Sequence, residues 1–202
     1  MLFLDFSPRP PSVPTFVFGE VCLRAPGLTD FDQWADLRKR SREHLVLWEP
    51  AWREGELTRD AYRMRVRQQW RDIRRGAALP MLVFRQIDNA LVGGITLSNI
   101  RYGASRTAVV GYWTGAPYVR RGYARAALEA MLAHAFRSLS LNRVEAACQP
   151  GNVASVRLLE SCRFTREGLA RDYLKINGAW RDHSLYAITA GEFLRGDAVE
   201  GS

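Results

Sequence analysis

A glycine flanked by arginines, in the segment Arg120-Arg121-Gly122-Tyr123-Ala124-Arg125, is the first feature whose residue types could do chemistry. An apolar stretch precedes it and a long helical pattern follows, so Gly122 marks a turn from a strand into a helix. The amides of a first helical turn have no acceptor within the helix, and the helix dipole places partial positive charge there. Glycine lets a ligand approach this backbone closely, and arginines can bind further phosphate oxygens. The turn therefore suits a pyrophosphate, although a glycine before a helix often marks a turn and nothing more.

A second polar pair, Asn152 and Ser155, lies at the start of another short helical pattern. Asn152 is a good N-cap, and that structural role would be enough to explain it. Ser155 lies in the first helical turn, where its hydroxyl could face a ligand over the neighbouring strand ends. Neither common nucleotide-binding fingerprint accompanies the pair, since the chain contains no Gly-x-Gly-x-x-Gly and no Gly-Lys-Ser.

In their order along the chain, these motifs resemble those of a known family. The pattern consists of Gly-Tyr-Trp (111–113), Arg-Arg-Gly-Tyr-Ala (120–124), Arg-Val-Glu-Ala (143–146), Asn-Val-Ala-Ser (152–155), Glu-Gly (167–168) and Trp-Arg-Asp (180–182). It is similar to that of the GCN5-related N-acetyltransferases (GNAT), and more narrowly of the RimJ/RimL ribosomal-protein alanine N-acetyltransferases. The resemblance spans roughly residues 21–189. It implies acetyl-CoA as the donor, a primary amine as the acceptor and direct transfer within a ternary complex.

The resemblance also implies which residues hold the cofactor. Tyr112, Trp113 and Thr114 would lie along the pantetheine arm, on a strand that splays from its neighbour. The amides of the 121–124 turn would hold the pyrophosphate, with the side chains of Arg120 and Arg125 beside it. Asn152 matches a cofactor-contacting asparagine, and Ser155 matches the hydroxyl proposed to protonate the departing CoA thiolate. No metal is implied.

The chain departs from the family pattern at several positions. Val119 stands where Gln or Arg usually opens the phosphate motif, but its backbone amide is retained. Val109 replaces a glutamate that serves many members as general base. Leu159 stands where other branches carry a tyrosine acid, which moves that role onto Ser155. Cys162-Arg163-Phe164 replaces Leu-Gly-Phe, a change expected to alter a helix end rather than the chemistry.

Three residues are candidates for deprotonating the amine. Asp172 matches a position at which some RimL-type members have a catalytic carboxylate, while His44 and Glu49 lie in the segment that lines the acceptor side in relatives. Structural roles are open for each of them: an exposed strand carboxylate for Asp172, and packing or hydrogen bonding for His44. An α-amino group has a pKa of about 8, so roughly a tenth of it is neutral at pH 7 and a weak base or a water relay would suffice.

Hydrophobic periodicity predicts the elements that position these residues. Together with the resemblance, it predicts a single α/β domain with the GNAT fold over residues 15–192, a flexible tail at 1–14 and a C-terminal tail at 193–202. The fold has a central mixed and mostly antiparallel twisted sheet flanked by helices, in the order βααβββαβαββ. Helices are expected at 29–42, 58–76, 124–139 and 152–162, and strands at 15–26, 79–86, 91–98, 106–113, 143–149, 168–175 and 180–189, with an Asn177-Gly178 hairpin turn.

The formal charge of +8 is carried almost entirely by arginine, since Lys39 and Lys175 are the only lysines. Such an excess favours polyanions. The expected helix at 58–76 is strongly basic outside its apolar face, and a solvated face is the simpler interpretation of those arginines. The chain shows no membrane-length apolar run and no signal peptide, so we expect a cytoplasmic protein. Its three cysteines, Cys22, Cys148 and Cys162, predict neither a disulfide framework nor a zinc site.

The favoured function is acetylation of the N-terminal α-amine of a protein, with a ribosomal protein as the partner suggested by the Trp48-Glu49-Pro50 segment typical of the RimJ/RimL branch. One alternative is acetylation of a small amine such as an antibiotic or a polyamine. Another is a non-catalytic acyl-CoA sensor or a ribosome- or RNA-binding protein, although direct nucleic-acid binding is not the first expectation.

Overall fold

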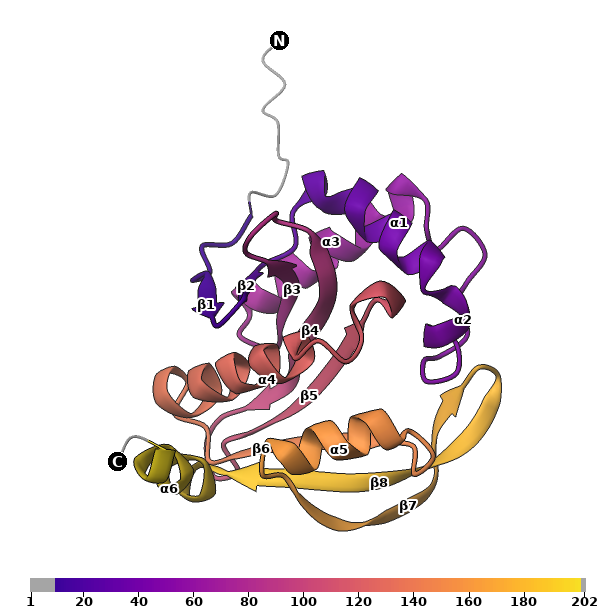
Figure 1. Cartoon of the computed structure of the whole chain (residues 1–202). Helices are drawn as coiled ribbons and strands as arrows, with labels where there is room; N and C mark the ends of the chain where they lie inside the picture. Colours follow the sequence, from indigo (N-terminus) through magenta and orange to yellow (C-terminus); the bar gives the residue numbers. More distant parts are fainter. Residues whose placement is uncertain (1–9, 201–202) are drawn as a thin grey trace.

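The chain folds around one eight-stranded sheet with helices on both faces (Figure 1). This computed structural model describes residues 10–200; residues 1–9 and 201–202, within the two predicted tails, lie outside the described range. The strands are β1 (Phe16–Phe18), β2 (Val21–Arg24), β3 (Leu79–Arg85), β4 (Leu91–Arg101), β5 (Thr107–Thr114), β6 (Arg143–Cys148), β7 (Thr165–Ile176) and β8 (Ala179–Thr189). The helices are α1 (Phe31–Arg40), α2 (Arg42–Leu45), α3 (Arg59–Arg74), α4 (Tyr123–Ala133), α5 (Val153–Ser161) and α6 (Ala190–Glu200).

The strand order confirms the predicted sheet. It runs β1-β2-β3-β4-β5-β6-β8-β7, and every neighbouring pair is antiparallel except β5 and β6, which are parallel. The mixed, mostly antiparallel sheet of a single-domain α/β fold is therefore present. The predicted order omits three short or terminal elements: β1, which the turn at Gly19 separates from β2, and the helices α2 and α6.

Both faces of the sheet are buried, and strand alternation divides the core in two. On β3, Met81 joins the cluster that contains the apolar stripe of α4. Its neighbour Leu82 points to the other face, into a cluster that includes Trp34 of α1 and Tyr62 of α3. The sheet is thus a middle layer, with α1 and α3 on one face and α4 on the other.

Helix α3 forms where periodicity predicts it. The side chain of Thr58 accepts a hydrogen bond from the Ala61 amide at 3.3 Å and so caps the helix. The stripe of Tyr62, Val66 and Trp70 is buried, as the spacing requires.

The helix expected at residues 29–42 is present as α1, and the short helix α2 follows it. Ser41, between them, has a non-helical backbone and is almost fully buried. Its hydroxyl accepts a hydrogen bond from the Ala116 amide at 2.9 Å, which ties the end of α1 to the segment between β5 and α4. No local pattern contains this long-range contact.

The C-terminal segment also differs from the expected tail at 193–202, because residues 190–200 form α6. Phe193 is buried, and its ring lies 5.3 Å from that of Phe136. Tertiary packing therefore continues the ordered structure past residue 192.

Membrane-spanning helices and metal-binding clusters are both absent from the described residues. No helix within residues 10–200 is long and apolar enough to cross a membrane. No group of three or more His, Cys, Asp or Glu side chains in this range could hold a metal ion. The three cysteines are free thiols, two of them buried.

Candidate active site

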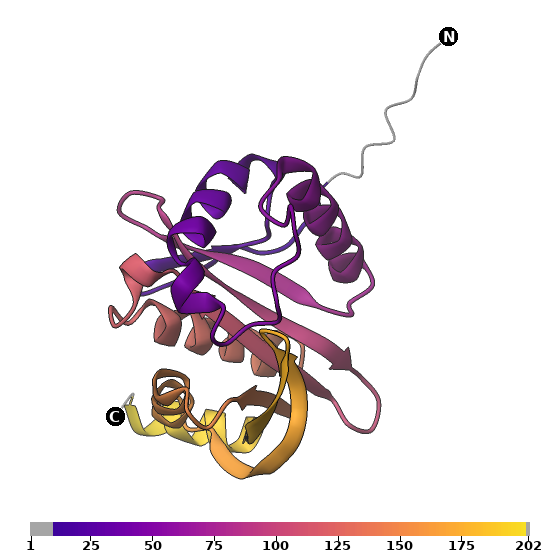
Figure 2. The same ribbon diagram turned by 90° about the vertical axis from the view of Figure 1, so that its right-hand side faces the viewer.

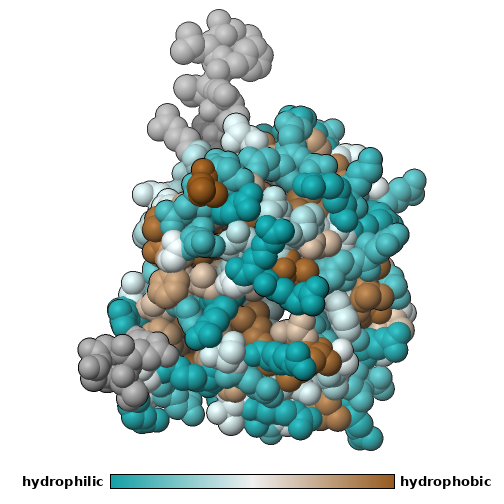
Figure 3. Space-filling model, viewed as in Figure 1, coloured by the Kyte–Doolittle hydropathy of each residue, from teal (hydrophilic) through white to brown (hydrophobic). Residues whose placement is uncertain are grey.

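The parallel strands β5 and β6 diverge, and the candidate site lies where they separate. Their register covers only three residue pairs, from Thr107 opposite Arg143 to Val109 opposite Glu145. Beyond Val109, β5 continues to Thr114 and pairs only with β4. The backbone groups on its other edge therefore have no neighbouring strand. Figure 3 shows hydrophobic residues gathered around a hollow in the middle of this face, between the positions of α4 and α5 in Figure 1. A free strand edge beside a hollow can hydrogen-bond an extended ligand.

The glycine turn before α4 has the conformation that its sequence predicted. Gly122 is the N-cap of α4 with φ of +81°, and Arg120 also has a positive φ of 58°. Arg121 and Gly122 are exposed, and a Cβ built on Gly122 would meet no atom within 4 Å. The start of α4 is therefore open to solvent at Gly122, which fits the approach of an anionic group such as a pyrophosphate.

The predicted cofactor residues of two elements meet in one small pocket. Tyr112, Trp113 and Thr114 of β5 line it together with Tyr123 and Ala124 of α4. Arg125, the last of the predicted contacts, is exposed on α4 and forms an ion pair with Glu129 at 2.8 Å.

Ser155 lies opposite β5 and is held from two sides. Its amide donates to the Asn152 side-chain oxygen at 3.1 Å, so Asn152 is the N-cap of α5. Its hydroxyl lies 2.7 Å from the phenol oxygen of Tyr112. The Cys148 thiol at the end of β6 is close enough for Ser155 to affect its pKa. Strand β5 thus places a phenol on the Ser155 hydroxyl, while Asn152 holds the Ser155 amide.

Burial keeps the neighbours of Ser155 protonated. Desolvation raises the pKa of the Tyr112 phenol, and the hydrogen bond to Ser155 only partly opposes this effect. Burial likewise raises the pKa of the Cys148 thiol. Near neutral pH the two groups are therefore neutral, and the Tyr112 phenol can donate a hydrogen bond to the Ser155 oxygen, which leaves the Ser155 hydrogen free for another acceptor.

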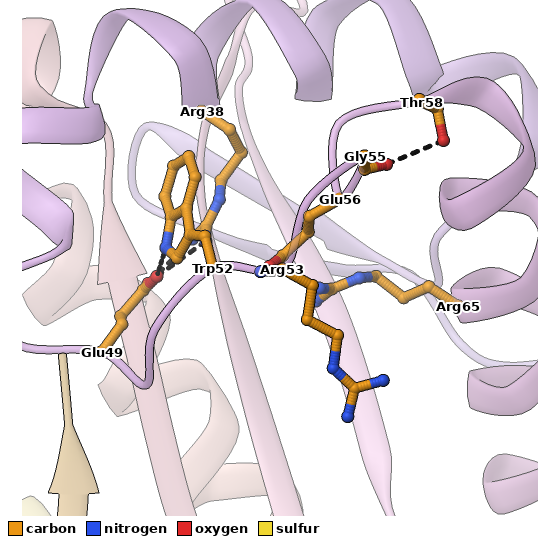
Figure 4. A network of polar contacts seen from close by, with 8 residues as sticks. All are labelled: Arg38, Glu49, Trp52, Arg53, Gly55, Glu56, Thr58 and Arg65. Carbon is orange, nitrogen blue, oxygen red and sulfur yellow. Dashed lines mark hydrogen bonds and ion pairs between the residues drawn. The ribbon is translucent and has the colours of Figure 1, made fainter. Parts of the chain in front are cut away.

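Glu49, a candidate base, is engaged in a different cluster (Figure 4). Its two carboxylate oxygens accept hydrogen bonds from Arg38 at 2.8 and 2.7 Å, and the Trp52 indole donates a third at 3.0 Å. The Arg38 guanidinium is stacked between the rings of Trp52 and Trp113, at 4.3 and 5.0 Å from their centroids. This arrangement joins the segment after α2 to β5.

A glycine makes room for that stack. A Cβ on Gly94 would come within 2.5 Å of the Trp113 indole nitrogen, so the ring lies directly on the bare backbone of β4. The contacts therefore run from the β4 backbone outward, through Gly94, Trp113, Arg38 and Trp52. Trp52 belongs to the segment that also carries Glu49.

A groove of about 790 Å³ opens beside this stack. Its walls come from α1, the 49–56 segment, α3, and strands β3 and β4. Trp34, Trp52 and Trp113 give it aromatic surface. Gly94, Ile95 and Trp113 line both this groove and the small pocket by α4, so the two adjoin through β4 and β5.

The other two candidate bases lie apart from the Ser155 cluster. Asp172 is exposed on an irregular part of β7, with a positive φ of 48°, and its amide donates to Asp182 at 2.9 Å. His44 is half-buried on α2. The described residues form no hydrogen bond between either side chain and Ser155 or Tyr112.

Comparison with known proteins identifies this arrangement. The model of the acetyltransferase (GNAT) domain family matches residues 20–165. The chain belongs to the GNAT family. Similar proteins include the ribosomal protein uS5-alanine N-acetyltransferase of Escherichia coli (strain K12), which is 30% identical over 83% of this chain and 87% of its own length.

Two solved structures have the same fold. The ribosomal-protein-S5-alanine acetyltransferase of Vibrio fischeri superposes with a TM-score of 0.83 at 28% identity, covering 90% of this chain and 99% of that one. Mycobacterium smegmatis RimJ in complex with CoA-disulfide gives a TM-score of 0.82 at 31% identity, covering 93% and 95%. This GNAT N-acetyltransferase therefore uses acetyl-CoA as its donor.

The site contains two groups whose importance the sequence pattern did not reveal. The Tyr112 side chain was expected along the pantetheine arm, and its pairing with Ser155, 43 residues away, has no local signature. Arg38 was read only as part of a helix, because its partner Glu49 lies 11 residues away across an irregular segment. Of the two, Tyr112 could be found more easily from the sequence, because its phenol lies on the strand predicted to hold the cofactor.

Proposed function

We propose that this enzyme acetylates the N-terminal α-amine of a protein, with a ribosomal protein as the favoured acceptor. The observation that carries the proposal is the 790 Å³ groove that adjoins the cofactor pocket through Trp113 and Gly94. The volume falls within the range of about 300–1,000 Å³ typical of ligand sites, and the open form of the groove would let the rest of an acceptor chain leave the site. Similarity to an enzyme that acetylates uS5 on alanine supports the choice, and such an acceptor would place the enzyme in the cytoplasm.

In this proposal the chain's own residues perform the binding and the proton transfers. Acetyl-CoA supplies the activated acyl group. The β5 edge at Tyr112–Thr114 holds the pantetheine arm, and the 121–124 amides, with Arg120 and Arg125 beside them, hold the pyrophosphate. Asn152 fixes the first turn of α5 and so the position of Ser155.

We assign the acid role to the Ser155 hydroxyl, which protonates the departing thiolate sulfur. Tyr112 is 2.7 Å away, and its buried phenol stays protonated, so it can donate a hydrogen bond to the Ser155 oxygen while the Ser155 hydrogen goes to the sulfur; the serine then takes a proton back from solvent. Other branches of the family carry a tyrosine at the position of Leu159 on α5. Here the Tyr112 phenol, which comes from β5, would lie near the same site.

Deprotonation of the amine makes a smaller demand on the protein. Roughly a tenth of an α-amine with a pKa of about 8 is already neutral at pH 7. Asp172 and His44 are the two candidate bases, while Glu49, with both oxygens held by Arg38, is assigned a positioning role.

Mass spectrometry of acceptor reactions tests the function. The purified enzyme is incubated with acetyl-CoA and either an alanine-initiated peptide, the same peptide with its α-amine blocked and one free lysine, or spermidine. The proposal expects the mass gain of one acetyl group on the first peptide alone. Acetylation of spermidine without acetylation of the α-amine peptide would instead support a small-molecule acetyltransferase.

The Ser155→Ala variant tests the acid role in the same assay. General acid catalysis contributes roughly 10²–10⁴-fold in rate, and the thiolate is a good leaving group, so we expect kcat to fall about 10–100-fold. The dissociation constant of CoA, measured by calorimetry, should change by less than about threefold. Tyr112→Phe should cause a smaller loss, because it leaves the Ser155 hydroxyl in place. Unchanged turnover in Ser155→Ala would remove this residue from the mechanism.

A further inference from the structure

Helix α3 presents a row of arginines on the flank that faces away from the acceptor groove. The helix contains six arginines against two aspartates, a net charge of +4 within a chain of +8. Arg65 and Gln68 line the groove. Arg63, Arg67 and Arg71 follow one another every four residues, about 6 Å apart along the axis, on a different flank. One helix therefore has a groove-lining side and a basic side.

Three ion pairs neutralise part of this charge. Arg59 pairs with Asp32 and Arg63 with Asp60, but both pairs are exposed and contribute little, and Arg65 pairs with Glu56 on the groove side. Within residues 10–200, Arg67 and Arg75 form no ion pair. The outer flank of α3 is thus positively charged in the folded protein as well as in the sequence.

The basic surface continues onto the hairpin between β4 and β5. The Ile100 amide donates to the Ala77 carbonyl at 3.1 Å, which joins this hairpin to the segment that follows α3. Figure 2 shows α3 and the hairpin on the same, right-hand side of the molecule. Two exposed or turn arginines, Arg101 and Arg106, flank Tyr102, whose side chain is 55% exposed. An exposed aromatic side chain therefore shares this hairpin with two exposed arginines.

We propose that this surface, made of Arg67, Arg71, Arg74, Arg75, Arg101, Arg106 and Tyr102, binds RNA. The guanidinium groups contact backbone phosphates, and an unpaired base stacks on Tyr102. Arginine rather than lysine supplies the charge, and its planar fork binds phosphate oxygens in pairs. Stacking on an exposed aromatic ring beside a basic track is typical of single-stranded nucleic-acid binding.

Two other polyanions fit the surface less well. On α3 and the β4–β5 hairpin the exposed large hydrophobic side chains are Met64 and Tyr102, which do not make the continuous apolar face with which an amphipathic helix enters a membrane. An acidic protein segment would form ion pairs with the arginines, but it offers no planar group comparable to a nucleic-acid base for stacking on the Tyr102 ring. Because the opposite flank of α3 lines the groove, RNA bound here would hold an associated protein acceptor near that groove.

Fluorescence anisotropy with a labelled RNA hairpin, whose loop has roughly ten unpaired nucleotides, tests the proposal on the full chain. Between about 50 and 200 mM KCl we expect dissociation constants of roughly 1–100 μM that weaken steeply with salt. Arg67→Gln/Arg71→Gln/Arg75→Gln should weaken binding by more than about tenfold and reduce the magnitude of the logarithmic salt slope by about 2. Tyr102→Ala should weaken binding to the hairpin but not to a fully paired RNA duplex.

A charge-matched control separates this surface from net charge. Arg157→Gln/Arg166→Gln/Arg181→Gln removes the same three charges from exposed positions on α5, β7 and β8 and should keep RNA affinity within about twofold. Arg71→Glu/Arg101→Glu is a second surface variant, and thermal unfolding confirms that each variant is folded. Acetylation of a short acceptor peptide should be unchanged in all of them, so this result is independent of the proposed acceptor.

Three outcomes would overturn the proposal. The first is an equal loss of RNA affinity in the surface and control variants, which would indicate binding by net charge alone. The second is full RNA affinity in both surface variants. The third is binding to polyglutamate or to phosphatidylserine vesicles that matches binding to RNA and does not depend on Tyr102.

Discussion

Replacing Glu49 with glutamine removes the negative charge from the Arg38–Glu49 pair while keeping the size of the side chain. The Arg38 side chain is only 6% exposed and that of Glu49 is 22% exposed, so little water can replace the lost carboxylate. Removing one partner of a buried pair costs about 3–5 kcal/mol. Because Glu49 is partly exposed and glutamine can still accept one hydrogen bond, we expect about 2–3 kcal/mol.

For a domain of this length, each kcal/mol lowers Tm by about 2–4 °C, so Glu49→Gln should lower Tm by roughly 5–10 °C. Thermal unfolding followed by circular dichroism measures this change. Glu167→Gln is the matched control, because Glu167 pairs with Arg143 at the surface with 45% of its side chain exposed. That substitution should cost no more than about 1 kcal/mol.

The same variant decides whether Glu49 positions a segment or accepts a proton. If it positions the 49–56 segment, the KM for the acceptor peptide should rise several-fold, kcat should fall less, and the pH dependence of kcat/KM should keep its shape. An unchanged Tm, together with a kcat reduced about 100-fold or more and a flattened pH profile, would refute this reasoning and assign Glu49 as the general base.

Three further predictions follow from local geometry. Gly94→Ala should cost about 1–3 kcal/mol in unfolding free energy, because the new Cβ would displace the Trp113 indole, whereas Gly111→Ala, with no atom within 4 Å, should cost much less by the same urea titration. Gly122→Ala should raise the KM for acetyl-CoA and leave the acceptor KM unchanged, since φ of +81° disfavours alanine; Gly122→Asn, which tolerates this conformation, should recover part of the loss. Burial lowers the pKa of His134, so on acidification the unfolded chain is protonated at this residue before the folded one. The free energy of unfolding should therefore fall as pH drops from about 6.5 through the lowered pKa. Urea unfolding at two pH values should show that His134→Gln loses this part of the acid sensitivity.

Local signals in the sequence were sufficient for most of the elements. The Tyr62, Val66 and Trp70 stripe predicts α3 and its buried face, and the expected start at residue 58 agrees with Thr58 as the N-cap. Asn177-Gly178 predicts a hairpin, and both residues have the positive φ that this turn requires. Such features depend on the spacing and backbone preferences of adjacent residues, which are fully written in the sequence.

The same reasoning missed what depends on distant partners. Ser41, between α1 and the unpredicted helix α2, accepts a hydrogen bond from the Ala116 amide 75 residues away. Phe193 extends the ordered chain because it finds Phe136 to pack against. No pattern within a few residues of either position carries that information.

The sequence by itself determined the donor half of this enzyme. The strand, the Gly122 turn and the following helix form a continuous segment, so the spacing and backbone preferences of adjacent residues were enough to predict it. Only the tertiary structure decided the rest: that Tyr112 meets Ser155, that Glu49 is held by Arg38, and that a groove opens beside Trp113. The physical reason is that these contacts join side chains from different elements, so they exist only after the sheet has brought β5, α1 and α5 together.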